Sequence, residues 1–139
     1  MPAIAITPFV LKDAVLSIGT DDYQAHVSSV QFVPTTQTVQ WQSITPAGSF
    51  TDTTSPSWTC TLAYAQDWKT VNSLSQYLLT NAGQKKTVVF KPQGATTGSP
   101  IFTAEIMIAP GPIGGDVNTV QAATVTLGVV GAPVKTAAP

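Results

Sequence analysis

Alternation of apolar and polar residues recurs along the chain and predicts β-strands. In its clearest form Trp58, Cys60, Leu62 and Tyr64 alternate with threonine and alanine over residues 57–64. A period of two places successive side chains on opposite faces of a strand. Less regular versions of the pattern predict further strands at 9–18, 23–33, 36–43, 87–91, 102–109 and 117–130. The pattern therefore predicts a mainly β chain.

One segment departs from this period and predicts a single helix, from about 67 to 81. Val71, Leu74 and Leu78 recur at helical spacing, which predicts that they pack on the outer side of the sheets. Asp67 is the expected N-cap, because its carboxylate can accept the unpaired N–H groups of the first turn. Gly83 is the expected stop.

Residues 44–57 hold two prolines, a glycine and many serines and threonines, which predicts a loop. It is long for a connection inside a compact domain, and long loops are usually functional. Ile44, Phe50 and Asp52 are its candidate subunit-interface residues. Exposed apolar residues on a loop suggest a partner surface, so we expect this loop to bridge subunits.

The two ends of the chain differ from the domain predicted at 9–130. Residues 1–8 predict an N-terminal arm in which Ile4 and Ile6 lie between two prolines, and both isoleucines are further interface candidates. We expect the arm to become ordered against a neighbouring copy. Residues 131–139 are mostly small and predict a C-terminal tail lying on the surface. Imperfect alternation near Ser28 predicts a β-bulge.

Composition argues against several classes of function. Only 9% of the 139 residues are charged, the formal net charge is −1, and the chain has no arginine. Such a chain lacks the field needed to hold nucleic acid or an anionic membrane. Low charge also does little to oppose self-association. The chain has no secretory start and no apolar run of membrane-spanning length, so we expect it to be made in a cytoplasm.

Candidate chemistry is sparse. Cys60 is the single cysteine, which excludes an intrachain disulfide and predicts a buried, inert thiol. His26 is the single histidine and accompanies no nucleophile motif. No enzyme, cofactor or metal site is expected. Trp41, flanked by glutamines, leaves open a minor carbohydrate-binding hypothesis.

Several stretches carry a likeness to known proteins: WTCTLAYAQDW, SLSQYLL, NAG, VVFKP, FTAEIMIAPGPIGGDVNTV and ATVTLGVVGAP. They resemble the major tail tube protein of long-tailed, siphovirus-like bacteriophages, notably phages of actinobacteria. The resemblance spans about residues 9–133, and its motifs are structural. It implies a β-sandwich or barrel flanked by one α-helix. It also implies hexameric rings that stack into a hollow virion tail tube through which DNA passes unbound.

The resemblance further implies partners: other copies of the chain, the tail tip, the tape-measure protein and the tail terminator, with synthesis in the host cytoplasm. Six copies giving four strands each would form a barrel of about 24 strands, roughly 37 Å across at about 4.8 Å per strand. The alternative hypothesis is an immunoglobulin-like binding or decoration module on a virion surface. The chain lacks the Cys–Trp–Cys pattern of true immunoglobulin domains, and a helix after residue 65 is unusual there.

Overall fold

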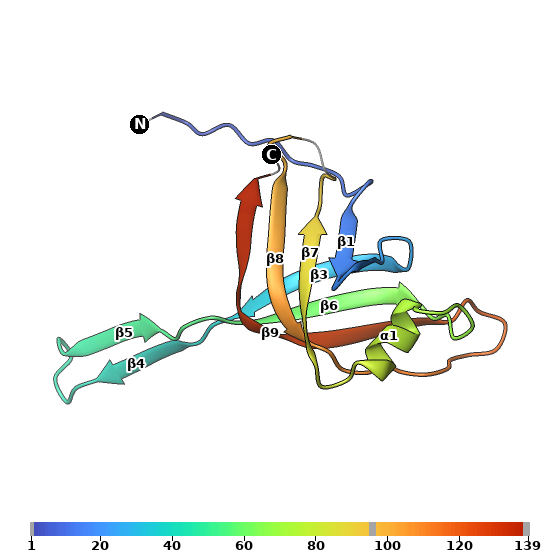
Figure 1. Cartoon of the computed structure of the whole chain (residues 1–139). Helices are drawn as coiled ribbons and strands as arrows, with labels where there is room; N and C mark the ends of the chain where they lie inside the picture. Colours follow the sequence, from blue (N-terminus) through green and yellow to red (C-terminus); the bar gives the residue numbers. More distant parts are fainter. Residues whose placement is uncertain (1, 95–96, 138–139) are drawn as a thin grey trace.

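The computed structural model describes residues 2–94 and 97–137, which form antiparallel sheets and one short helix (Figure 1). The predicted mainly β chain with one helix is therefore confirmed. The elements are β1 (Val15–Ile18), β2 (Asp21–Asp22), β3 (Val27–Thr35), β4 (Thr38–Gln42), β5 (Ser49–Thr53), β6 (Ser57–Ala65), α1 (Leu74–Thr80), β7 (Lys85–Lys91), β8 (Pro100–Met107) and β9 (Ala122–Ala137).

Seven strands form one sheet in the order β2-β1-β7-β8-β9-β6-β3, and β4 pairs only with β5. The long strand β9 belongs to both halves of the sheet. Its residues 122–128 pair with β6, and its residues 129–137 pair with β8. Figure 1 shows β9 bending between these two partners. The sheet therefore folds over at β9 and encloses a core.

The core consists of the inward residues of both halves. Leu16, Ile18, Val88 and Ile106 from one half meet Cys60, Leu62 and Leu127 from the other, and all seven are at most 1% exposed. The alternation that predicted the strands explains this burial, because every second side chain points inward. Each buried aliphatic side chain contributes about 1.5–3 kcal/mol.

The predicted helix at 67–81 is too long, because α1 begins only at Leu74. Asn72 has a left-handed φ of 63°, which interrupts any helix entering from Asp67. Asp67 instead closes its own turn, accepting the N–H groups of Lys69 and Thr70 at 3.0 and 3.1 Å. Leu74 and Leu78 are buried as predicted, but Val71 is 80% exposed and the prediction for it is wrong.

The bulge predicted near Ser28 is confirmed. The register of β3 against β6 shifts between Val27 and Ser29. The extra residue lets Val27 and Val30 both pack against the core, although they are three positions apart.

The predicted loop at 44–57 is wrong over its middle, where β5 pairs with β4 to form a hairpin. The turn is closed by a bond from the Ser43 N–H to the Gly48 carbonyl at 2.6 Å. A Cβ at Gly48 would overlap the Ser43 side chain, so this turn requires glycine. In Figure 1 the hairpin extends well away from the folded sheet.

Three other boundaries differ from the sequence prediction. The strand predicted at 9–18 is formed only by Val15–Ile18, because the chain bends at residues 12–13. The strand predicted at 117–130 begins at Ala122. Residues 131–137 of the predicted tail continue β9 and pair with the edge of β8, and most of them are exposed, as expected of a surface segment. Residues 138–139 lie outside the described residues.

Candidate assembly surfaces

The β4–β5 hairpin carries two faces of opposite character. Trp41 lies directly opposite Phe50, and Val39 lies opposite Asp52, so these four side chains share one face. The other face holds only polar residues: Thr38, Gln40, Gln42, Ser49, Thr51 and Thr53. Trp41 is 63% exposed and Phe50 is 58% exposed. The hairpin is therefore an amphipathic ribbon whose apolar face has no cover within the described chain.

The tip of the hairpin adds a further apolar side chain. Ile44 lies in the turn and is fully exposed. A two-stranded hairpin with no sheet or helix behind it is at best marginally stable in water. Packing of the Trp41 and Phe50 face against another surface would remove both the exposed apolar area and this weakness.

The N-terminal arm is the second exposed apolar segment. Ile4 and Ile6 are 95% and 85% exposed. None of the described hydrogen bonds involves residues 2–9. The arm meets the fold at Phe9, which lines a hollow together with Phe102 and Lys135. In Figure 1 it then runs past the ends of β8 and β9 and beyond the sheet.

Open strand edges form the third surface. Residues 129–137 of β9 pair with β8 along one edge, and no described strand pairs with the other edge. At the far side of the same half-sheet, β1 has only the two-residue strand β2 as its outer neighbour. Natural proteins usually guard open edges with charge, yet Lys135 is the one charged residue in 129–137.

An apolar hollow also lies between the two halves of the sheet. It has a volume of about 260 Å³ and is lined by Phe32, Trp58, Phe90, Phe102 and Pro133. The indole N–H of Trp58 is buried without a hydrogen-bond partner among the described residues.

Two ionisable side chains in the core have raised pKa values. Burial raises the pKa of the Cys60 thiol to about 12, which keeps it protonated and unreactive at neutral pH. Burial, reinforced by the neighbouring Asp21 carboxylate, raises the pKa of Tyr23 to about 12. Within residues 2–94 and 97–137, no group of three or more His, Cys, Asp or Glu side chains could hold a metal ion. The same residues contain no helix with the length and apolarity needed to cross a membrane.

The five candidate interface residues fall into two groups. Phe50 and Asp52 share one hairpin face and Ile44 lies at its tip, whereas Ile4 and Ile6 lie on the separate arm. All five are exposed. Trp41 was not among the predicted interface residues, although it lies two residues after Val39 in the strand predicted at 36–43 and so shares a face with it. It also did not select the connection before β9, where Ile113, Val117 and Val120 are exposed.

Compared with known proteins, the chain matches no protein-family model and no curated protein.

Proposed function

We propose that this protein is the structural subunit of a bacteriophage tail tube, and that its copies join into six-membered rings that stack into a hollow tube. The observation that carries the proposal is a half-sheet that is open along residues 129–137 of β9 and covered at β1 only by the short segment 21–23, next to a projecting amphipathic hairpin. The family resemblance of the sequence supports the same conclusion.

The strand directions at β1 and at the second half of β9 suit ring formation, provided that the short segment 21–23 moves away from β1 when copies join. The half-sheet has the order β1-β7-β8-β9, and each neighbouring pair is antiparallel. The two outer strands, β1 and the second half of β9, therefore run in opposite directions. When β9 of one copy meets β1 of the next, the new pair is also antiparallel. An edge-to-edge ring can thus continue the hydrogen-bond pattern of the sheet.

The outward face of this half-sheet suits the lining of a channel for DNA. Facing away from the core are Thr87, Val89, Thr103, Glu105 and Val130, with Lys85 and Lys91 at the ends of β7. This small, mixed set of charges gives phosphate groups little to bind, so DNA would pass without being held. Six such half-sheets would form a barrel with a backbone diameter of roughly 37 Å.

The hairpin supplies the contact between rings in this proposal. Its apolar face would pack on the adjacent ring and so bury Trp41 and Phe50. The end rings would contact the tail tip and the tail terminator, and the tape-measure protein would occupy the bore during assembly.

Electron microscopy of the purified full chain, combined with light scattering over a range of concentrations, tests the proposal. We expect rings or tubes with sixfold symmetry and a mass that grows with concentration or on long incubation. Some tail proteins require an initiator, so a parallel sample includes the tail tip complex. A strict monomer under all of these conditions would contradict the proposal and favour the decoration-module alternative.

A further inference from the structure

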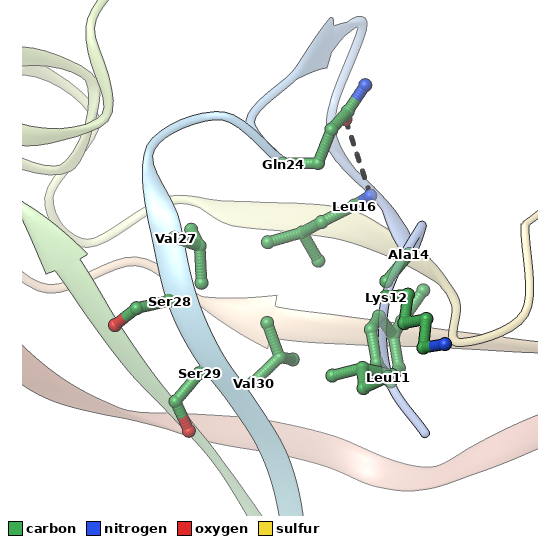
Figure 2. A pocket seen from close by; sticks show the side chains of 10 residues that line it. Leu11, Lys12, Ala14, Leu16, Gln24, Val27, Ser28, Ser29 and Val30 are labelled. Atoms are coloured by element: carbon green, nitrogen blue, oxygen red, sulfur yellow. Dashed lines mark hydrogen bonds between the residues drawn. The ribbon is translucent and has the colours of Figure 1, made fainter. Parts of the chain in front are cut away.

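A cavity of about 150 Å³ lies where the folded sheet fails to close, between the chain leading into β1 and the start of β3 (Figure 2). Its apolar lining comes from Leu11, Leu16, Val27, Val30 and Phe90. Its polar rim comes from Lys12, Gln24, Ser28 and Ser29. In Figure 2 the side chains of Leu16, Val27 and Val30 point into the gap, whereas those of Ser28 and Ser29 point away from it.

The backbone on both sides of this gap is incompletely paired. β3 is the last strand of the sheet and pairs only with β6, so its other edge faces the gap. Across the gap, the Leu16 carbonyl accepts the Tyr23 N–H at 2.8 Å, but the Leu16 N–H reaches only the side-chain oxygen of Gln24 at 3.5 Å, the long limit for a hydrogen bond. An extended segment entering the gap would find backbone partners along β3 and an apolar floor.

The N-terminal arm has the composition of such a segment. Residues 3–7 are Ala-Ile-Ala-Ile-Thr, so an extended arm presents Ile4 and Ile6 on one side and small residues on the other. The β4–β5 hairpin fits the gap less well, because its two strands already pair with each other. In contrast, the arm leaves its backbone groups free. Pro2 and Pro8 limit any added strand to these five residues, because proline cannot donate a ladder hydrogen bond.

The course of the arm leads it to a neighbouring copy. Phe9 and the cavity lie on the same, core-facing side of the half-sheet. Phe9 lines a hollow with Phe102, and Phe90 lines the cavity. Phe90 and Phe102 are paired across β7 and β8, and both pack toward the core. From Phe9 the arm runs beyond β9 (Figure 1). In a ring joined from β9 to β1, the next copy's β1 and the gap beside it lie just past that edge. Seven residues, 2–8, span up to about 25 Å when extended, which is several strand spacings.

We infer that the N-terminal arm of one copy docks as an added strand in the β1–β3 gap of the next copy, with Ile4 and Ile6 on the floor formed by Leu16, Val27 and Val30. This inference rests on the ring of the proposed function for its geometry. The docked arm adds a strand to the sheet of its neighbour. It also makes a second contact between neighbouring copies, on the side of the sheet that faces away from the bore.

Photo-crosslinking in assembled protein tests the inference. A benzophenone amino acid replaces Ala5 in unlabelled full-length chains, which are mixed with ¹⁵N-labelled wild-type chains before assembly. We expect unlabelled arm peptides joined to labelled peptides that contain residues 11–16 or 24–30. The inference would be overturned if the arm crosslinked only to its own chain, to the hollow at Trp58 or to the hairpin. It would also be overturned if tubes formed and no crosslinks were found in them.

A second measurement does not depend on ring formation. A synthetic peptide of residues 2–9 is titrated into the full-length ¹⁵N-labelled chain while backbone amide signals are recorded. We expect saturable shifts at Leu16 and Val27–Val30. An Ile6→Ser peptide should bind about tenfold more weakly or worse, since it loses one buried aliphatic side chain. An Ala5→Ser peptide, altered on the opposite side, is the matched control and should bind within about twofold of the original.

The two experiments separate failure of the inference from failure of the proposed function. Tubes whose arms crosslink elsewhere leave the tube function standing and remove the docking site. Specific peptide binding in the gap by a chain that never forms rings retains the site and contradicts the tube. Absence of both rings and peptide binding contradicts both.

Discussion

Asn72 determines which side chains of the segment before α1 reach the core. Its left-handed φ turns the chain between Val71 and Leu74, so that two residues at helical spacing point in different directions. The side chains of Ser73 and Ser75 are buried and bond to the backbone of Asp67, which ties the preceding turn to the helix start. Burial here therefore depends on one backbone conformation more than on hydrophobic periodicity.

Replacement of Leu74 by alanine should lower the free energy of unfolding by about 2–5 kcal/mol, because Leu74 is 0% exposed and its loss leaves a cavity. The matched control is Val71→Ala, three residues earlier and exposed, which should change stability by no more than about 0.5 kcal/mol. Urea denaturation followed by fluorescence measures both. Equal effects of the two substitutions would show that the turn at Asn72 does not separate their environments.

Gly111 is required by a close approach to a buried tyrosine. A Cβ at this position would overlap the hydroxyl oxygen of Tyr64, so Gly111→Ala should cost about 1–3 kcal/mol. Removal of that oxygen in Tyr64→Phe should restore much of the loss, a coupling that a double-mutant cycle measures. Gly128→Ala meets no atom within 4 Å and serves as the control, with an unchanged or slightly raised stability expected. Additive effects at Gly111 and Tyr64 would refute the steric explanation.

At the scale of elements, the β4–β5 hairpin is structurally separate from the core. It lies outside the seven-stranded sheet and contributes none of the core residues. Its apolar face can therefore change without disturbing the body of the protein.

The double substitution Trp41→Ser with Phe50→Ser should abolish or strongly weaken assembly while leaving the thermal unfolding of the body nearly unchanged. The physical reason is that both side chains lie on the exposed apolar face. Gln40→Ser with Thr51→Ser changes the opposite face of the same strands and is the control. Sedimentation and electron microscopy measure assembly, and circular dichroism measures the fold. Normal tubes from the first variant would exclude this face as a contact between copies.

The sequence predicts an element well when its burial follows a local pattern, and poorly when the element depends on pairing with a remote strand. β6 was predicted within one residue because its inward residues alternate regularly with threonine and alanine. β5 was missed because five residues of serine, threonine, Phe50 and Asp52 resemble a polar loop, although threonine favours strands. Residues 131–137 were missed because their pairing partner, β8, is remote in sequence. Exposure of Ile44 and Phe50 followed from composition, but the pairing of Phe50 with Trp41 required the register.

For the whole molecule, the burial of ionisable groups makes stability decrease at alkaline pH. The pKa of Cys60 is raised from 9.0 to about 12 by burial, and that of Tyr23 from 10.0 to about 12, first by burial and then by Asp21. The unfolded chain releases these protons at lower pH than the folded chain does. Unfolding therefore becomes more favourable as pH rises above about 9.

We expect the contribution of Cys60 to the free energy of unfolding to be constant below pH 9 and to decrease between pH 9 and 12. The slope for this group approaches about 1.4 kcal/mol per pH unit. Urea titrations at several pH values measure it. Cys60→Ala lowers stability overall, but it should remove the pH dependence of the free energy of unfolding between pH 9 and 10. In this range the tyrosines of the unfolded chain release fewer protons than they do at higher pH. An unchanged slope in that variant would assign the alkaline loss to other groups.

The shared pairing of β9 also has a consequence for the order of folding. This strand supplies a partner to β6 and to β8, so neither half of the sheet can complete its hydrogen bonding before β9 is in place. The residues that β9 joins to β6 lie far apart in sequence, and such pairings form slowly. Until they form, β6 and β8 each present a bare strand edge, and the chain is then most exposed to aggregation.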